Sequence, residues 1–474
     1  MSLSRKLDDL AVQSVEWTVR QFQKRVPYSS SNFYLEGPYA PVTEERTETE
    51  LHVTGSIPPE LNGLYARIGP NPLHVDNPAA YHLFLGDGMV HGVRLRDGKA
   101  LSYRNRWVGA RSVNRKLGRP FLEGTGPFDV VNTNIIGHGG RIWALVEGGV
   151  TPAEMDGDLN TLKRGLFDSG AHKGYTAHPK LDPLTGDLHA ICYSVTAPNK
   201  IFHVVVNAQC QVTQTTAIPV THGPMVHDCA VTASNVVVLD LPVTLTPMDL
   251  LRGSQYPFRW NEKHRARVGL LPKQGNADQI RWFDVEPCYV FHTGNAVDLP
   301  DGGAMIDVVV HDRIFDRSTQ DLARSPVTLE RWTLNPQRRD VKREVLCDRR
   351  QEFPRFDERL SGQDYRYLYS VGIDTTQHIP QPLYRYDLKT GQRQEHHYGP
   401  NGLTGEVVFV PRSNDSAEDD GWLLSYVYDL EQERSDLVIL NAQDIEGEPQ
   451  AIVHLPVRVP LGFHGNWIAD PVSR

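Results

Sequence analysis

A repeated turn pattern constrains the fold of this chain more than any other feature of its sequence. From Leu51 to the end of the 474-residue chain, short apolar runs alternate with two-residue turns that contain glycine. Such turns between alternating strands are typical of β-hairpins, so the pattern predicts an all-β fold. The turns are Asn62-Gly63, Asp87-Gly88, Asp97-Gly98, Thr185-Gly186, Asp301-Gly302, Thr390-Gly391 and Asp420-Gly421.

The length of this β-rich region favours a closed, repeating architecture. No proline-rich, serine-rich or charged linker divides the middle of the chain, which indicates one large domain. Sandwiches and small barrels use far fewer residues, so a β-propeller of four-stranded blades is the economical solution. We therefore expect residues 36–474 to form a propeller domain.

Residues 1–35 are expected to form an amphipathic helical extension before the propeller. Between Ser4 and Val26, apolar residues recur at helical spacing on one broad face, and charged residues lie mostly off that face. This helix would either dock on the surface of the domain or help to rest the protein on a membrane interface.

Composition excludes several classes of protein. A formal net charge of -9 provides no basic field for a phosphate backbone, so we expect no nucleic acid partner. The five cysteines are odd in number and form no CxxC pair, which argues against a disulfide framework and a zinc-thiolate site. No apolar stretch is long enough to span a bilayer, and none has signal-peptide form. We expect a cytoplasmic protein, with membrane association possible.

Four histidines in apolar or glycine-rich settings are candidates for a metal site. A single histidine of this kind is more often a satisfied structural residue, but four could supply a centre made only of imidazoles. Three glutamates fall into the same series, whose successive members are 31 to 65 residues apart, mostly about one propeller blade. One such residue per blade would form a ring around the axis. The series is Glu147, His178, His227, His292, Glu352, Glu406 and His464.

Motifs distributed in order along the chain resemble those of the carotenoid cleavage oxygenases, an iron-dependent family. Each motif alone is weakly specific, but the whole set in this order is highly specific. Besides the four histidine segments, the motifs are Ala66-Arg67-Ile68-Gly69-Pro70-Asn71-Pro72, Gly86-Asp87-Gly88-Met89-Val90-His91-Gly92, Asn132-Thr133-Asn134, Trp143-Ala144-Leu145-Val146-Glu147-Gly148-Gly149, Glu352-Phe353-Pro354, Gly405-Glu406-Val407-Val408-Phe409-Val410-Pro411-Arg412 and Ser435-Asp436-Leu437-Val438-Ile439-Leu440.

The resemblance implies a seven-bladed β-propeller with one Fe(II) on its axis and helical and loop insertions over the top face. The implied iron ligands are His178, His227, His292 and His464. It also implies carboxylates behind three of the imidazoles: Glu147 behind His227, Glu352 behind His292 and Glu406 behind His464. A carboxylate that accepts the outer ring N–H fixes the tautomer and the ring angle.

The activity implied by the resemblance is cleavage of one carbon-carbon double bond by O2, giving two carbonyl products, with no organic cofactor. Family members that cleave hydroxylated stilbenes or phenylpropenoids carry a lysine immediately before the first glutamate, where this chain has Val146. An aliphatic side chain cannot engage a phenolate, so Val146 favours a carotenoid or apocarotenoid substrate.

Three alternatives to a polyene-cleaving enzyme remain at this point. They are a stilbene-cleaving or phenylpropenoid-cleaving oxygenase, a member similar to the retinoid isomerases, and a non-catalytic propeller scaffold. An apolar substrate also favours contact with a bilayer, for which residues 242–258 are a candidate segment besides the N-terminal helix.

Overall fold

The computed structural model describes residues 24–126, 128–168, 174–248, 256–316, 325–374 and 377–470, together with residues 18 and 21. Strands dominate these ranges, which confirms the all-β prediction. The helical elements are short: α2 (Arg111–Lys116) and the 3-10 turns η1 (Phe33–Leu35), η2 (Gly37–Tyr39), η3 (Pro78–Ala80), η4 (Leu83–Leu85), η5 (Ala277–Gln279) and η6 (Glu358–Leu360). Most of the predicted N-terminal helix lies outside the described residues. No helix within them is long and apolar enough to cross a membrane.

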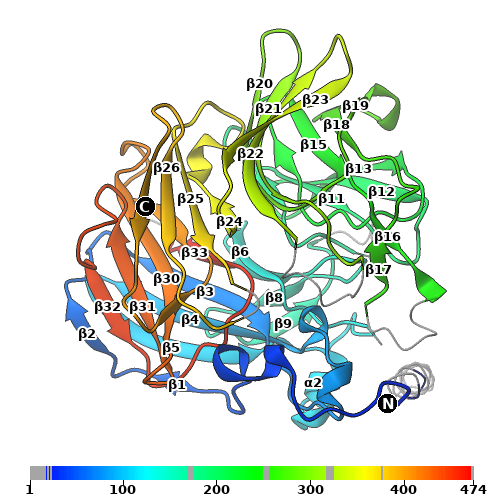
Figure 1. Cartoon of the computed structure of the whole chain (residues 1–474). Helices are drawn as coiled ribbons and strands as arrows, with labels where there is room; N and C mark the ends of the chain where they lie inside the picture. The colour runs from blue at the N-terminus through cyan, green and yellow to red at the C-terminus, as the bar shows by residue number, and fades with distance from the viewer. Residues whose placement is uncertain are drawn as a thin grey trace.

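The sheets surround a common axis in a propeller-like ring (Figure 1). The first three, in hydrogen-bonded order, are β1 (Thr47–Glu48), β5 (Lys99–Trp107), β4 (Gly88–Arg96), β3 (Gly63–Pro70) and β33 (Gly465–Ala469); β6 (Asn134–His138), β7 (Arg141–Leu145), β8 (Ala153–Met155) and β9 (Thr161–Arg164); and β10 (Lys180–Leu181), β11 (Leu188–Cys192), β12 (Lys200–Val206) and β13 (Val212–Pro219).

An eight-stranded sheet follows along the chain, with a two-stranded ribbon inserted in it. The order is β14 (Ala230–Val231), β15 (Asn235–Asp240), β18 (Arg267–Pro272), β19 (Arg281–Asp284), β23 (Asp340–Cys347), β22 (Val327–Asn335), β21 (Ala304–His311) and β20 (Tyr289–Asp298), and the ribbon is β16 (Val243–Leu245) with β17 (Phe258–Trp260). The last two sheets are β24 (Gln351–Arg355), β25 (Tyr367–Gly372), β26 (Leu383–Asp387) and β27 (Gln392–His396); and β2 (His52–Gly55), β32 (Ala451–His454), β31 (Arg434–Asn441), β30 (Gly421–Asp429) and β28 (Gly402–Thr404), with β29 (Val408–Pro411) also on β30.

The two ends of the ring interlock. The C-terminal strand β33 pairs antiparallel with β3 in the first sheet, from Gly63↔Ala469 to Arg67↔Gly465. In return, the early strand β2 pairs with β32 in the last sheet. These reciprocal pairings close the ring because each of the two sheets contains strands from both ends of the chain, and closure removes sheet edges that would otherwise be exposed.

The blade count from hydrogen bonding differs from the expected seven separate sheets. Among the described strands there are six sheets of four or more strands, because β19 and β23 join two sets of four into one sheet. That junction is a single parallel pair, Asp284↔Asp340. Side-by-side strand ends from neighbouring blades can form such a pair, and no periodicity in the sequence predicts it.

The predicted glycine turns serve two different purposes. Asp97-Gly98 connects β4 and β5 with positive φ at both residues (50° and 71°), as a two-residue hairpin turn requires. Thr185-Gly186, Asp301-Gly302 and Thr390-Gly391 also lie between paired strands. The other three begin strands: at Gly88, for example, a Cβ atom would overlap the carbonyl of Val131. Close backbone approach therefore explains this glycine.

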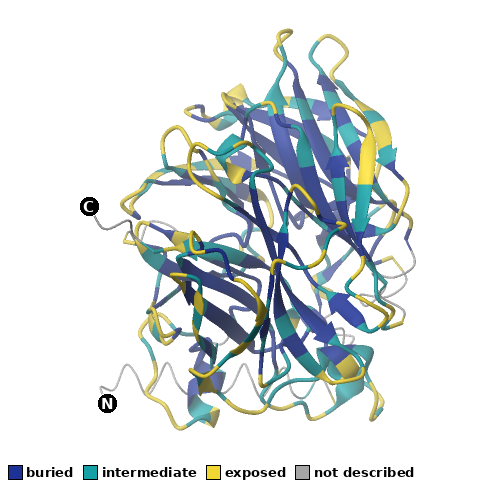
Figure 2. Ribbon diagram, turned by 90° about the vertical axis from the view of Figure 1, so that its left-hand side faces the viewer, coloured by how far each residue is buried: buried dark blue, intermediate teal, exposed yellow. Residues whose placement is uncertain are grey.

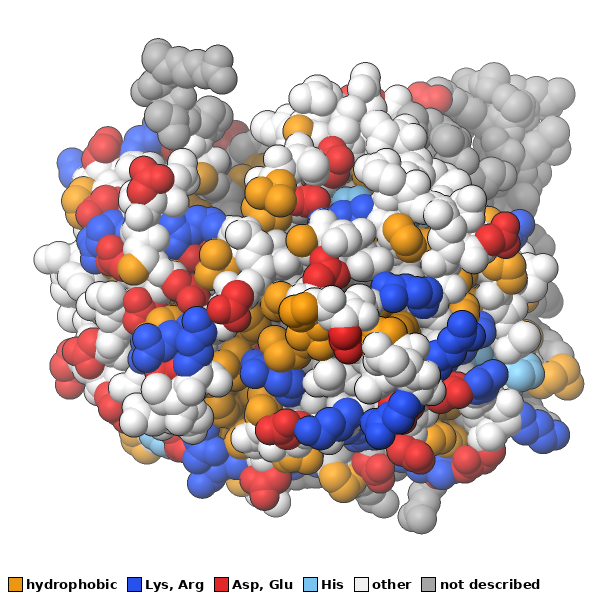
Figure 3. Space-filling model, turned by 90° about the horizontal axis from the view of Figure 1, so that it is seen from above, with side chains coloured by type: hydrophobic (Ala, Val, Ile, Leu, Met, Phe, Trp, Pro, Cys, Tyr) orange, Lys and Arg blue, Asp and Glu red, His pale blue; other side chains and the backbone are white. Residues whose placement is uncertain are grey.

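Apolar clusters between neighbouring sheets hold the ring together. One cluster joins the first and last sheets through residues such as Tyr65, Tyr103, Leu424 and Ile439, none of which is exposed. Figure 2 shows the same distribution, with buried strands inside and exposed residues concentrated at loops. On the face shown in Figure 3, acidic and basic side chains are interspersed, with no large field of one sign.

Candidate metal centre

Three strand starts and one strand bulge bring the four candidate histidines to the axis. His178 and His227 lie shortly before β10 and β14, and His464 immediately precedes β33. His292 lies inside β20, where the register with β21 shifts between Val290 and Thr293. A bulge of this kind redirects a side chain without ending the strand. His292 is therefore brought to the other three histidines by a register shift within β20 and not by the start of a strand.

The four imidazoles converge on one point. Their Nε2 atoms lie 3.1 Å apart for His178 and His227, 3.3 Å for His227 and His292, and 3.2 Å for His292 and His464. One ligand atom from each of the four lies within 4.8 Å of every other, and all four residues are buried. With a metal–nitrogen distance of about 2.1 Å, adjacent donors lie roughly 3 Å apart. The spacing therefore fits a single bound metal ion.

Glu352 supports His292 from behind. Its Oε2 lies 2.6 Å from His292 Nδ1, and its Oε1 lies 2.7 Å from Nε2 of a buried fifth histidine, His311. Burial would raise the pKa of Glu352, but the two imidazoles outweigh burial and hold it below its usual value. An ionised carboxylate can only accept, so His292 donates from Nδ1 and keeps its Nε2 lone pair for the centre.

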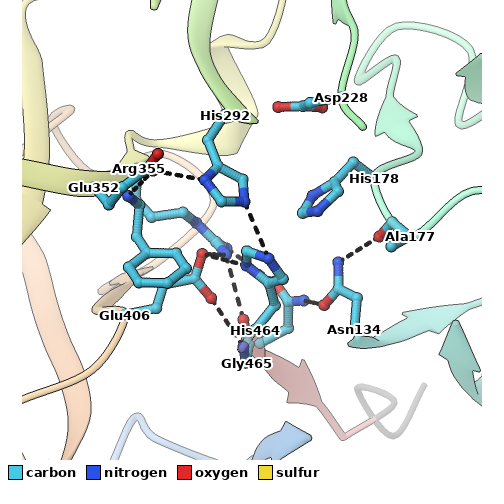
Figure 4. A network of polar contacts seen from close by, with 12 residues as sticks. Asn134, Ala177, His178, Asp228, His292, Glu352, Arg355, Glu406, His464 and Gly465 are labelled. Atoms are coloured by element: carbon cyan, nitrogen blue, oxygen red, sulfur yellow. Dashed lines mark hydrogen bonds and ion pairs between the residues drawn. The ribbon is translucent and has the colours of Figure 1, made fainter. Parts of the chain in front are cut away.

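Glu406 has the same relation to His464. His464 Nδ1 lies 3.1 Å from Oε1, and the backbone N–H of Gly465 donates to Oε2 at 2.9 Å (Figure 4). Arg355 adds an ion pair at 3.2 Å. Burial would raise the pKa of Glu406, but the charge of Arg355 and the contact with His464 lower it to about 2. This carboxylate is therefore ionised at neutral pH.

Glu147 lies behind His227, with 2.7 Å between Oε2 and Nδ1. The hydroxyl of Tyr193 donates to its other oxygen at 3.0 Å. His178 is different, because no carboxylate among the described residues contacts its ring. Burial and the neighbouring imidazoles hold the pKa of His178 well below its usual value, so this ring is neutral at neutral pH, as a metal ligand must be.

Sequence reasoning did not find several residues around the centre. His311, Tyr193 and Arg355 join the glutamates from other segments of the chain, and only Arg355 adjoins a recognised motif. Phe353, in the same segment, adopts a positive φ of 59°, and its ring centroid lies 5.2 Å from that of His292 and 5.3 Å from that of His464. A positive φ is rare for a bulky residue and commonly marks a functional site.

Two cavities of different character reach the histidines. The larger has a volume of about 890 Å³, contacts His227, His292 and His464, and is lined mainly by apolar and aromatic side chains, Val146 and Phe291 among them. The smaller, of about 260 Å³, contacts His178, His292 and His464 and is more polar, with Asp228 and Arg355 in its wall. A long apolar ligand therefore fits only the larger cavity, hereafter the tunnel.

Four imidazoles on the axis of a propeller-like ring, reached through an apolar tunnel, define a non-haem metalloprotein class that brings an apolar molecule to a metal. The family model described as retinal pigment epithelial membrane protein matches residues 39–469. The carotenoid cleavage oxygenase of Mycobacterium tuberculosis is 40% identical over 92% of this chain and 98% of its own length. The chain therefore belongs to the carotenoid cleavage oxygenase family.

Other relatives and solved structures agree. The carotenoid 9,10(9',10')-cleavage dioxygenase 1 of Pisum sativum is 31% identical over 94% of this chain and 91% of its own length. The crystal structure of Pseudomonas brassicacearum lignostilbene dioxygenase superimposes with a TM-score of 0.84 at 27% identity, covering 94% of this chain and all of the other. The structure of a variant of Synechocystis apocarotenoid oxygenase superimposes with a TM-score of 0.82 at 26% identity, covering 94% of this chain and 99% of the other.

Proposed function

We propose that this protein is a non-haem Fe(II)-dependent dioxygenase that cleaves a carbon-carbon double bond of a carotenoid or apocarotenoid with O2, giving two carbonyl products. The observation that carries the proposal is the convergence of four buried imidazoles beside the apolar tunnel. The names of the relatives, which describe carotenoid cleavage and apocarotenoid oxygenation, support the same reaction.

The donor set suits iron. Imidazole is a good ligand for iron, although it also binds zinc, copper and nickel, and family membership favours iron among them. We expect one Fe(II) per chain, held by His178, His227, His292 and His464. When bound, such an iron supplies a site at which O2 is activated beside an alkene. Four neutral ligands leave its 2+ charge uncompensated, and the carboxylates behind three of them partly balance that charge.

The residues of the chain would position the substrate and keep water away. Val146, Phe291 and Phe353 line the tunnel near the histidines and offer no strong hydrogen-bond partner to water. Aligning one double bond beside the metal turns a reaction between separate molecules into a reaction within one bound complex. In many enzymes such alignment removes a large part of the activation barrier. The choice of double bond then depends on the length and curvature of the tunnel.

The pattern of hydrogen-bonded sheets supports the expected seven blades. Dividing the eight-stranded sheet at its single Asp284↔Asp340 pair gives the four-stranded units β14-β15-β18-β19 and β20-β21-β22-β23. With the five other large sheets, this makes a ring of seven. His227 would then come just before the inner strand of one unit, and His292 would lie on the inner strand of the next.

The proposal is tested by loading the purified protein with Fe(II) and incubating it in air with carotenoids, apocarotenals and hydroxystilbenes, with products identified by mass. Aldehyde products from a polyene, absent under argon, are expected. A non-catalytic scaffold would give no product and hold no iron. An activity similar to retinoid isomerisation would proceed without O2 on a retinyl ester, and cleavage of hydroxystilbenes alone would indicate the phenolic class.

Replacing Glu352 by Gln is expected to weaken iron retention or turnover by roughly 10- to 100-fold without unfolding the protein. Glutamine cannot accept charge-assisted hydrogen bonds from both His292 and His311, so the His292 ring loses its fixed tautomer. Iron content after dialysis against a chelator measures the effect. The matched control is Glu330→Gln, which alters a buried carboxylate paired with Arg343 and not with a candidate ligand. Unchanged iron retention and turnover in Glu352→Gln would contradict the assigned role.

We further propose that the rim of the tunnel rests on a lipid surface. Several exposed apolar side chains line the tunnel, including Phe128 (65% exposed) and Met248 (58%), and Met248 falls in the predicted segment 242–258. Residues 249–255 of that segment lie outside the described residues. An apolar substrate could pass from the bilayer into the tunnel at this rim without crossing water.

The double substitution Phe128→Ser with Met248→Ser is expected to weaken binding to phosphatidylcholine vesicles at least tenfold. Burial of each large apolar side chain contributes about 1.5–3 kcal/mol, and 1.4 kcal/mol is tenfold in affinity. Co-sedimentation with vesicles measures the change. Leu184→Ser with Val345→Ser removes two exposed apolar side chains away from the tunnel and should bind like the unmodified protein. Equal binding by all three proteins would contradict membrane contact at this rim.

A further inference from the structure

A buried polar network links three of the ligand-bearing segments. Asp228 follows His227, Thr293 follows His292, and Lys180 comes two residues after His178. The carboxylate of Asp228 accepts from the backbone N–H of Thr293 at 2.8 Å, and its two oxygens lie 3.0 and 3.1 Å from Nζ of Lys180. Each of the three residues adjoins or nearly adjoins a candidate ligand, and the three segments belong to different strands.

Asp228 has no capacity left for other partners. The hydroxyl of Thr293 lies 2.9 Å from Oδ2, and the backbone N–H of Cys229 donates to Oδ1 at 2.7 Å. The side chain of Asp228 is 1% exposed, whereas that of Lys180 is 21% exposed and opens to the smaller, polar cavity. A buried carboxylate with four or more donors is held in one position, because a displaced carboxylate would lose charge-assisted bonds to all of them.

Main-chain pairing does not perform this linkage. The strands that carry or follow these ligands, β10, β14 and β20, are edge strands, and no ladder joins any two of them in the described part of the chain. No ladder therefore fixes the 3.1 and 3.3 Å spacings between the imidazoles of His178, His227 and His292, and side-chain contacts between the edges contribute to them. The weak contact of Cys229 Sγ with the carbonyl of His178, at 3.8 Å, is another such contact.

The four histidines of the centre are not all supported in the same way. Three of the imidazoles have a carboxylate behind the ring, whereas no carboxylate among the described residues contacts that of His178. The segment of His178 is instead tied to its neighbours through Lys180 and Asp228. Support from behind the ring and support through the backbone both restrict where a ligand can move.

We infer that Lys180, Asp228 and Thr293 form a positioning clamp that fixes the distances between His178, His227 and His292 and so slows release of the metal. None of the three touches the ligand nitrogens, so they act through the histidines and are positioning residues. The inference rests on the proposed metal centre. It assigns to Asp228 a role comparable to that of the carboxylates behind the rings, although Asp228 contacts no imidazole.

The test measures how fast metal leaves the protein. Unmodified protein and variants are loaded with Co(II), and its release to an excess of chelator is followed together with the visible absorption spectrum and the thermal unfolding midpoint. Asp228→Asn is expected to speed release at least tenfold and to change the Co(II) spectrum, because the ligand geometry relaxes. Lys180→Met should act in the same direction, and Lys180→Arg, which can keep the ion pair, should behave like the unmodified protein.

The matched control is Arg343→Met. It removes the cation of an ion pair with a buried carboxylate, with Nε 2.8 Å from Glu330, and neither partner belongs to a ligand-bearing segment. Its release rate and Co(II) spectrum should equal those of the unmodified protein. Unchanged release in Asp228→Asn and Lys180→Met, or an equal acceleration in Arg343→Met, would overturn the clamp. If Asp228→Asn does not fold, Lys180→Met decides the question, since that side chain is partly exposed. Failure of the unmodified protein to retain any metal would instead contradict the proposed function.

Discussion

Replacing His227 or His464 by alanine is expected to abolish both iron retention and double-bond cleavage, whereas the unmodified protein should hold about one iron per chain. Removing one of four ligands leaves an open position in a buried site, and carboxylates hold two of the three remaining donors in place, so no nearby side chain can move in as a replacement. Iron content by elemental analysis and product formation from an apocarotenal measure the two effects.

A histidine outside the centre provides the control. His397 has a side chain that is 65% exposed, and His397→Ala should retain iron and activity at the level of the unmodified protein. Full iron occupancy and activity in both His227→Ala and His464→Ala would rule out the ligand assignment. Loss of iron with a retained thermal unfolding midpoint would separate a metal effect from a loss of fold.

The sequence predicts the strands and the convergence of the histidines for reasons that are local. A turn such as Asp97-Gly98 can be recognised in the sequence because few residue types adopt positive φ at two successive positions. The series of histidines and glutamates could be matched to a ring because each falls in a separate motif. The structure brings the four imidazoles together and places Glu147, Glu352 and Glu406 behind three of them.

The remaining features depend on contacts between distant segments. In the sequence, Asp228 resembles any other acidic residue. Its role becomes visible only in the structure, where Thr293 and Lys180 from two other strands contact its carboxylate. The pairing of Glu352 with His311 arises in the same way, from β24 and β21. No spacing along the chain encodes these contacts, since they depend on how neighbouring sheets pack around the axis. The single pair that merges two sets of four strands has the same origin.

Substrate class is the point at which the solved structures do not discriminate. The lignostilbene dioxygenase and the apocarotenoid oxygenase are similar to this chain at 27% and 26% identity, with TM-scores of 0.84 and 0.82. The fold is thus compatible with a phenolic or a polyene substrate, and the lining of the tunnel must decide. Val146 lines the tunnel, as His227, His292 and His464 do, and it immediately precedes Glu147, which contacts His227.

The substitution Val146→Lys is expected to reduce cleavage of an apocarotenoid at least tenfold, and the unmodified enzyme should show little turnover of hydroxystilbenes. An ammonium group in an apolar tunnel must either lose its proton or draw water in, and both disturb the binding of a polyene. Initial rates on one apocarotenal and one hydroxystilbene, with iron content measured in parallel, test both statements.

Val345→Lys introduces the same side chain at an exposed valine outside the tunnel and should leave the rates unchanged. Efficient cleavage of hydroxystilbenes by the unmodified enzyme, without activity on any apocarotenoid, would overturn the assignment, because a tunnel residue other than Val146 would then have to bind the phenol.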